Sequence, residues 1–119
     1  MKICVTSTGE TIEAEVDPRF GRCRYFLVVD TDHGSVECIS NESVVGGAGV
    51  RAAQTVAKTG AKVVLTGNIG PNAFQVLQSA GVKVFTGVKG KVKDAIEGYK
   101  KGLLRETVSP TVDSHSGIR

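Results

Sequence analysis

The segment "AKVVLTGNIGPNAFQVLQSAGVKVFTG", Ala61 to Gly87, contains two short apolar runs on either side of a helical pattern. The runs "AKVVLTG" and "VKVFTG" predict buried strands. The pattern between them starts at Pro71, stops at Gly81 and repeats small apolar residues at helical spacing: Ala73, Val76, Leu77 and Ala80. Two strands joined through a helix pair in parallel, so this segment predicts an α/β fold.

Two more helical patterns flank this unit. Upstream, "VVGGAGVRAAQ" (Val44 to Gln54) opens a predicted helix that ends at Gly60, with an apolar face of Val50, Ala53, Val56 and Ala57. Downstream, "KVKDAIEGYKKGLL" predicts a third helix, with an apolar stripe of Val92, Ala95, Ile96, Tyr99 and Leu103. The second half of the chain thus alternates helices and strands.

The first half predicts three strands, at Lys2–Ser7, Tyr25–Asp32 and Ser35–Ser40. The last two form a hairpin around the turn "DHG". Right-handed crossovers then favour a mixed five-stranded sheet in the order 3-2-1-4-5, with the second strand antiparallel to the others and helices on the faces. We expect one domain over residues 1–104 and a flexible tail over 105–119.

Composition limits the classes of function. The chain has 119 residues, 40% of them hydrophobic, and no apolar run approaches the roughly 20 residues that cross a bilayer. We therefore expect a cytoplasmic protein without a membrane partner. The 15 basic residues are spread along the chain without a dense block, which disfavours nucleic acid as a partner.

The three cysteines contain no C-x-x-C pair, which argues against a closed metal cage within one chain. Cys4 and Cys38 lie in strand patterns and are expected to be buried. Cys23 lies in "DPRFGRCRYF" among Arg19, Arg22 and Arg24. We expect neighbouring guanidinium groups to promote ionisation of this thiol and make it a soft metal ligand. The alternative is a solvated basic turn.

Ligands of such sheets collect beyond the carboxyl ends of the strands, here between the first and fourth strands. The segments expected to meet there are Ser7–Gly9, Gly46–Gly49 and Gly67–Gly70. Two of them precede helices, whose free N–H groups favour an anion. Close helix–sheet packing without a ligand is the alternative explanation for the glycines.

Two other classes of site fit the sequence less well. Gly47, Gly49 and Ala52 spell G-x-G-x-x-A, but a dinucleotide fingerprint follows the first strand and needs a later carboxylate, which "VVLTGN" lacks. A nuclease using two metal ions needs acidic residues on central strands, and "KICVTS" has none. His33 lies in a turn and His115 in the tail, so no catalytic constellation is apparent.

The segments "DPRFGRCRYFLVVD", "GGAGVRAAQTVAKTGAKVVLTGNIGPNA", "LQSAGVKVFTG" and "VKDAIEGYKKGLL" closely resemble the dinitrogenase iron-molybdenum cofactor biosynthesis family, from about Lys2 to Leu104. The resemblance implies a three-layer ribonuclease-H-like fold that carries an anionic metal-sulfur cluster, of the iron-molybdenum type or related, rather than catalysing a reaction. The family's FGR loop corresponds to Phe20-Gly21-Arg22 and its glycine loop to Gly47-Ala48-Gly49. Some members carry a His just ahead of the glycine loop, where this chain has Val44 and Val45.

These arguments predict a cluster site with Cys23 as a metal ligand and nine further contacts: Arg19, Phe20, Gly21, Arg22, Gly47, Ala48, Gly49, Gly67 and Asn68. The expected partners are proteins that donate and accept the cluster, and the expected assembly is a monomer or weak dimer. Two alternatives remain open at this point. One is a nucleotide-binding or regulatory module that uses the glycine loop, and the other is an interaction domain whose partner recognises the basic loop.

Overall fold

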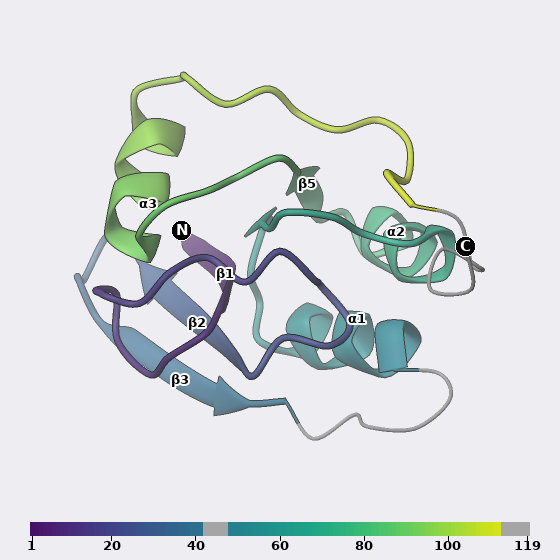
Figure 1. The fold of residues 1–119 in the computed structure, drawn as a ribbon, viewed down its shortest axis with the longest axis horizontal. Helices are drawn as coiled ribbons and strands as arrows, with labels where there is room; N and C mark the ends of the chain where they lie inside the picture. The colour runs from purple at the N-terminus through teal and green to yellow at the C-terminus, as the bar shows by residue number, and fades with distance from the viewer. Residues whose placement is uncertain (42–47, 113–119) are drawn as a thin grey trace.

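The computed structural model describes residues 1–41 and 48–112, which form a five-stranded sheet and three helices (Figure 1). The strand order is β3-β2-β1-β4-β5. This order confirms the predicted topology. In chain order the elements are β1 (Lys2–Ser7), β2 (Tyr25–Asp30), β3 (Val36–Ser40), α1 (Ala48–Lys58), β4 (Val63–Leu65), α2 (Pro71–Ser79), β5 (Lys83–Phe85) and α3 (Val92–Lys100).

The pairing of β1 shows why the sheet is mixed. β2 runs antiparallel to both β1 and β3, as predicted, whereas β4 is parallel to β1 and to β5. Cys4 lies opposite Val28 on one side and Val64 on the other. β1 is therefore the central strand, and its carboxyl end lies at the same edge of the sheet as the carboxyl ends of β4 and β5.

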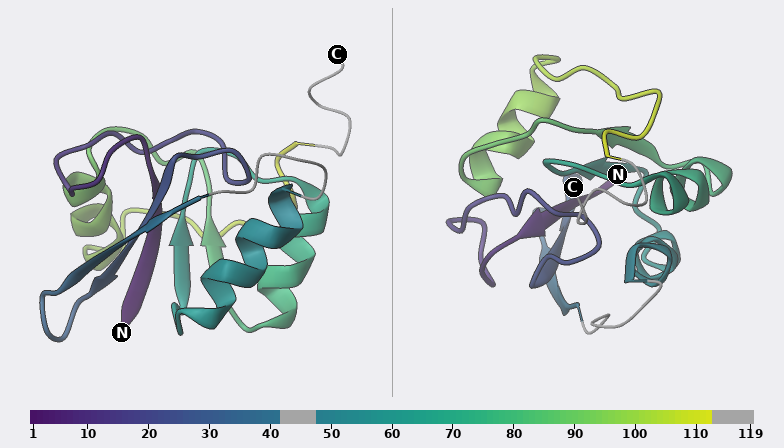
Figure 2. Two further views of the ribbon diagram at one scale, coloured as in Figure 1. Left: turned by 90° about the horizontal axis from the view of Figure 1, so that it is seen from below. Right: turned by 45° about the vertical axis from the view of Figure 1, so that its right-hand side comes forward.

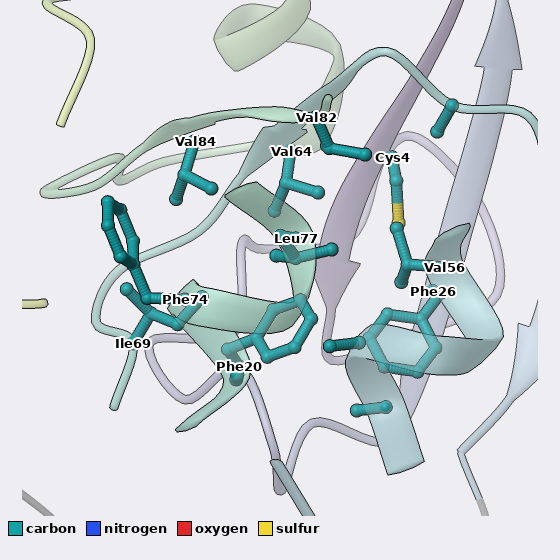
Figure 3. Close-up of a cluster of buried hydrophobic side chains, with 14 of the residues drawn as sticks. Cys4, Phe20, Phe26, Val56, Val64, Ile69, Phe74, Leu77, Val82 and Val84 are labelled. Carbon is teal, nitrogen blue, oxygen red and sulfur yellow. The ribbon is translucent and has the colours of Figure 1, made fainter. Parts of the chain in front are cut away.

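Two apolar clusters occupy opposite faces of the sheet. One contains the buried side chains of α1 and α2, including Val56, Phe74 and Leu77 (Figure 3). The other contains those of α3, including Val92 and Ile96. Figure 2 shows α1 and α2 on one side of the sheet and α3 on the other. The expected three-layer arrangement is confirmed, and burial of each large apolar side chain contributes about 1.5–3 kcal/mol to it.

Some expectations about single residues are wrong. Cys38 is exposed, because it lies on the edge strand β3 where α3 does not cover it. Leu103 is 74% exposed, because α3 ends at Lys100 and the chain turns at Gly102, whose φ is +72°. Ala80 is exposed and caps α2 instead of continuing its buried stripe.

The second strand ends earlier than predicted. The turn starts directly after Asp30, whose backbone N–H donates to Ser35 O at 2.9 Å and whose carboxylate accepts the N–H of Asp32 at 2.9 Å. β2 therefore stops at Asp30 instead of continuing to Asp32.

The segment after α3 runs along β5. Glu106 forms an antiparallel bridge with Phe85, and Thr107 N–H donates to Val84 O at 2.7 Å. Farther along, Thr111 N–H donates to Ile69 O at 3.0 Å. We call residues 105–112 the C-terminal strap. The predicted division into a domain over residues 1–104 and a flexible tail over 105–119 remains a prediction. In the described residues, no helix is both long and apolar enough to cross a membrane.

Candidate functional site

The loop that carries the FGR sequence crosses the carboxyl ends of β1 and β4. Asp17 N–H donates to Thr6 O at 2.8 Å, and the hydroxyl of Thr6 donates to Asp17 O at 2.7 Å. Asn68 N–H donates to Pro18 O at 2.8 Å. A Cβ on Gly67 would lie 2.5 Å from Pro18 Cα, so only glycine admits the loop there. The expected ligand position between β1 and β4 is therefore covered by protein.

Phe20 anchors this loop in the core. It is 2% exposed, and its ring lies 5.7 Å from that of Phe26, centroid to centroid. Figure 3 shows Phe20 pointing into the cluster beside Leu77 and Phe26. Phe20 N–H also donates to Asn68 O at 3.2 Å. The side chain predicted as a cluster contact thus holds the loop in place from below.

The FGR loop also lies against the start of α1. A Cβ on Gly21 would lie 3.0 Å from Gly49 Cα and 3.1 Å from Gly49 N. Ala48 beside it is buried. Gly21 and Gly49 allow the loop backbone and the start of α1 to touch, a contact between a loop and a helix rather than the helix–sheet packing considered for the glycines. The structure therefore brings the FGR loop together with Ala48 and Gly49, whereas Gly47 lies outside the described residues.

A hollow of about 430 Å³ opens beside the FGR loop, at the ends of β2 and β3. It contains three of the predicted site residues, namely Arg19, Arg22 and Cys23. Its other described lining residues are Arg24, Tyr25, Ser40 and Asn41. We call it the thiol hollow. The predicted contacts Gly67 and Asn68 are not among its described lining residues, because they lie under and beside Pro18 and Arg19.

Side chains alternate along the segment that borders the hollow. Arg22 and Arg24 are exposed, whereas Cys23 between them is buried. Arg24 lies over the ring of Tyr25, with its guanidinium carbon 5.7 Å from the ring centroid. Arg19 is paired with the buried carboxylate of Asp17 at 3.5 Å. The hollow therefore has a basic rim and a thiol in its wall.

The expectation that Cys23 ionises readily is wrong. Burial, and after it the charge of the Asp17 carboxylate, raises the pKa of Cys23 to about 12. The side chain of Asn41 and the charge of Arg19 act in the opposite direction but are outweighed. Cys23 is therefore a protonated thiol at neutral pH and would have to release its proton to become a metal ligand.

Asn41, which the sequence analysis did not identify, holds the backbone of Gly21 and Cys23 to the end of β3. Its side-chain amide donates to Gly21 O at 3.1 Å and to Cys23 O at 2.9 Å, and it lies 3.9 Å from Cys23 Sγ. Its backbone N–H donates to Arg24 O at 2.9 Å. The hairpin register is the signal that could have found it, because Ser40 pairs with Tyr25 and thereby places Asn41 beside Arg24.

The Ser7–Gly9 segment does not join the site. Thr8 N–H donates to Glu15 O at 3.0 Å, and a Cβ on Gly9 would lie 2.9 Å from Ala14 Cβ. The following loop continues toward α3, where Val92 N–H donates to Ala14 O at 2.9 Å. None of the described lining residues of the thiol hollow comes from Ser7–Gly9. Gly46 and Gly47 lie outside the described residues, so the expected meeting of the three segments stays a prediction.

Comparisons with known proteins assign the chain to a family. The sequence profile of a family described as dinitrogenase iron-molybdenum cofactor matches residues 1–102. The chain belongs to this family. Its fold is similar to the apo form of the orange protein from Desulfovibrio gigas, with a TM-score of 0.89 and 41% identity over 92% of this chain and 95% of that one.

The chain is also similar to two further proteins. A Thermotoga protein solved by NMR and provisionally assigned as a NifB protein has a TM-score of 0.78 and 31% identity, over 92% of this chain and 96% of that one. An uncharacterised protein of Methanocaldococcus jannaschii is 29% identical over 96 residues, which are 76% of this chain and 81% of the relative. The family connects the chain with the biosynthesis or binding of the iron-molybdenum cofactor.

Proposed function

We propose that this protein is a non-enzymatic carrier that holds an anionic metal-sulfur cluster, its cargo, in the thiol hollow. The observation that carries the proposal is the composition of that hollow. Arg22 and Arg24 are exposed on its rim, and Cys23 lies in its wall. Guanidinium groups donate hydrogen bonds to anionic acceptors, and a thiolate is a soft ligand for iron, copper or molybdenum–sulfur cargo.

The ligand set favours a preassembled cluster over a single metal ion. Among the described residues, no three His, Cys, Asp or Glu side chains are grouped so that they could hold a metal ion. Cys23 is therefore the single soft ligand that the described part of the hollow offers. A cluster that already carries its own sulfide needs few protein ligands, and the arginines supply the opposite charge.

Anaerobic reconstitution tests this proposal. The protein is incubated with sulfide and either iron, copper or molybdate, then desalted and examined by metal analysis and visible absorption. We expect a coloured protein with bound metal. Arg22→Ala is expected to lower retention roughly ten- to a hundredfold, because a charge-assisted hydrogen bond contributes about 1.5–3 kcal/mol. Lys89→Ala, an exposed change outside the hollow, serves as the control.

Two results would overturn the carrier proposal. One is a wild-type protein that remains colourless and metal-free after desalting. The other is equal retention by wild type, Arg22→Ala and Cys23→Ser, which would remove the thiol hollow as the site. A difference between the two variants would show whether charge or the thiol ligand contributes more to retention.

The nucleotide-binding alternative is disfavoured by the contact between Gly21 and Gly49. A dinucleotide phosphate approaches the glycines at the start of a helix, and here the FGR loop lies against Gly49. Calorimetric titration with NAD, FAD and ATP is therefore expected to give no heat of binding. Saturable heat from any of the three would favour the alternative.

A further inference from the structure

A second hollow, of about 470 Å³, lies between α1 and the end of β3. Ser40 and Asn41 line both this hollow and the thiol hollow, so the two adjoin. On the α1 side, the second hollow is lined by Arg51, Thr55 and Lys58, among others. We call it the α1 hollow. A molecule bound there would contact residues that also border the proposed cargo position.

The basic residues of the α1 hollow are not needed to pack the helix. Arg51, Thr55 and Lys58 follow the i, i+4, i+7 spacing that puts residues on one face of a helix. Arg51 and Lys58 are exposed, whereas Ala52 and Val56 on the other face are fully buried. The charged face of α1 is therefore free to contact another molecule.

Five cations line the two hollows, and Arg19 is the one among them that pairs with a described carboxylate, that of Asp17. Arg22, Arg24, Arg51 and Lys58 form no ion pair with any residue that the structure describes. No described lining residue of either hollow is acidic.

Near α3 the situation is different. Lys91 and Lys93 lie 3.5 and 3.1 Å from the carboxylate of Glu13, and Lys100 lies 3.7 Å from that of Glu97. Part of the positive charge near α3 is thus neutralised within the chain, whereas Arg22, Arg24, Arg51 and Lys58 have no such partner among the described residues and can face an outside anion.

We infer that the α1 hollow binds an acidic segment of the protein that delivers the cluster or takes it up. The inference rests on the proposed carrier function and adds the partner's chemistry to it. Carboxylates of the segment would accept hydrogen bonds from Arg51 and Lys58, while Gln54 and Thr55 offer neutral polar contacts. Such a patch raises the rate of encounter and orients the partner over the thiol hollow.

The size of the patch favours a protein segment over nucleic acid. Double-stranded DNA is typically held through about 6–10 phosphate contacts. The α1 hollow offers two cations without an ion-pair partner in the described chain, Arg51 and Lys58, because Arg22 and Arg24 belong to the thiol hollow and face the proposed cargo. A short run of carboxylates matches that number, and polar side chains between the cations suit a peptide backbone.

Fluorescence anisotropy with two labelled probes tests the inference. One probe is a short peptide of alternating Glu and Ser, and the other is a single-stranded oligonucleotide of similar charge. The test variant is Arg51→Glu with Lys58→Glu. The control is Lys89→Glu with Lys101→Glu, which changes the net charge equally at two exposed positions outside both hollows. Circular dichroism checks that both proteins remain folded.

We expect the test variant to bind the acidic peptide about tenfold more weakly than wild type, and the control to change affinity less than about twofold, since local charge complementarity outweighs net charge at short range. Equal weakening by the two variants would overturn the inference. Tighter binding of the oligonucleotide than of the peptide by wild type would overturn it too.

Cluster retention, measured on the same variants after reconstitution, separates this inference from the carrier proposal. The test variant is expected to retain the cargo as wild type does, because Arg51 and Lys58 lie outside the thiol hollow. Peptide binding at the α1 hollow by a wild-type protein that retains no cluster would contradict the carrier proposal alone. Normal retention without charge-specific peptide binding would contradict the docking inference alone.

Discussion

Asn41 shows how one side chain can determine whether a buried thiol is accessible. Its amide donates to the carbonyl oxygens of Gly21 and Cys23 and thereby holds the loop that buries the Cys23 thiol. Nothing in the spacing of "RCRYF" or "CISN" indicates this contact, because Asn41 and Cys23 are separated by a hairpin. The contact exists because β2 and β3 pair with Tyr25 opposite Ser40.

Replacing Asn41 by Ala is expected to lower the free energy of unfolding by about 1–3 kcal/mol, because two carbonyl groups lose their donor. It should also make Cys23 react faster with a thiol reagent. Both effects can be measured in a Cys38→Ser background, which removes the exposed cysteine. Asn68→Ala is the control, since Asn68 contacts Pro18 and Phe20 through its backbone N–H and carbonyl oxygen. Unchanged labelling of Cys23 would contradict the proposed role of Asn41.

Gly67 also determines the position of the FGR loop, because Pro18 of that loop lies directly against its Cα. A Gly67→Ala change would place a methyl group 2.5 Å from Pro18 Cα, and the backbone would have to shift. We expect a loss of about 1–3 kcal/mol in the free energy of unfolding, as for other overpacked sites. Gly70→Ala is the matched control, because its nearest neighbour is Val112 at 3.9 Å. Urea midpoints that fall equally for both variants would refute the argument.

Among the elements, the C-terminal strap connects the edge of the sheet to the loop before α2. The hydroxyl of Thr107 accepts a hydrogen bond from Thr86 N–H at 3.0 Å, and that of Thr111 accepts one from Ile69 N–H at 2.9 Å. The strap therefore pairs with β5 and supports the Gly67–Gly70 segment that contacts the FGR loop. The strap therefore contacts the Gly67–Gly70 segment, which in turn contacts the FGR loop beside the thiol hollow.

Thr107→Val should increase the rate of amide hydrogen exchange at Thr86, because the N–H of Thr86 loses its acceptor. The expected destabilisation is about 1 kcal/mol. NMR-detected exchange can measure the change at Thr86 and, for comparison, at residues of β1. Ser109→Ala, at an exposed position of the strap, should leave both sites unaffected. If Thr86 exchanges at the wild-type rate in Thr107→Val, the strap does not protect the edge of β5.

The elements also show which features of the structure follow from sequence patterns. Period and glycine spacing predict all three helices and all five strands, because local backbone preference and one-sided burial act over a few residues. The exposure of Cys38 depends on how far α3 extends over the sheet. The burial of Cys23 depends on Phe20 and Asn41, which are brought to it from elsewhere in the chain. Ser40 and Asn41 become site residues through strand register, which single-sequence patterns do not specify.

For the whole molecule, the burial of Cys4 in the central strand predicts that the free energy of unfolding falls at alkaline pH. Burial, with a smaller effect of Cys23, raises the pKa of Cys4 far above the unfolded value of about 8.5. The folded state thus holds this proton when the unfolded state has lost it. The contribution is complete below about pH 8.5 and is lost progressively as the pH rises above that value.

We therefore expect the wild-type free energy of unfolding to fall more steeply above about pH 8.5 than that of Cys4→Ala, by at most about 1.4 kcal/mol per pH unit for this group. Urea denaturation at several pH values measures the slopes, so the constant cost of the smaller side chain cancels. Parallel curves for the two proteins would contradict the prediction. Cys23, whose pKa is also raised, accounts for part of the slope that remains in the variant.

The separation of the two apolar clusters by the sheet has a consequence for protein engineering. The cluster under α1 and α2 includes Phe20 and Cys23, whereas the cluster under α3 includes neither. Changes that repack α3 can therefore raise or lower the melting temperature without reshaping the hollows beside β3. This makes the α3 layer the suitable place to attach a reporter or a surface tether, and leaves the opposite layer intact for work on the cargo.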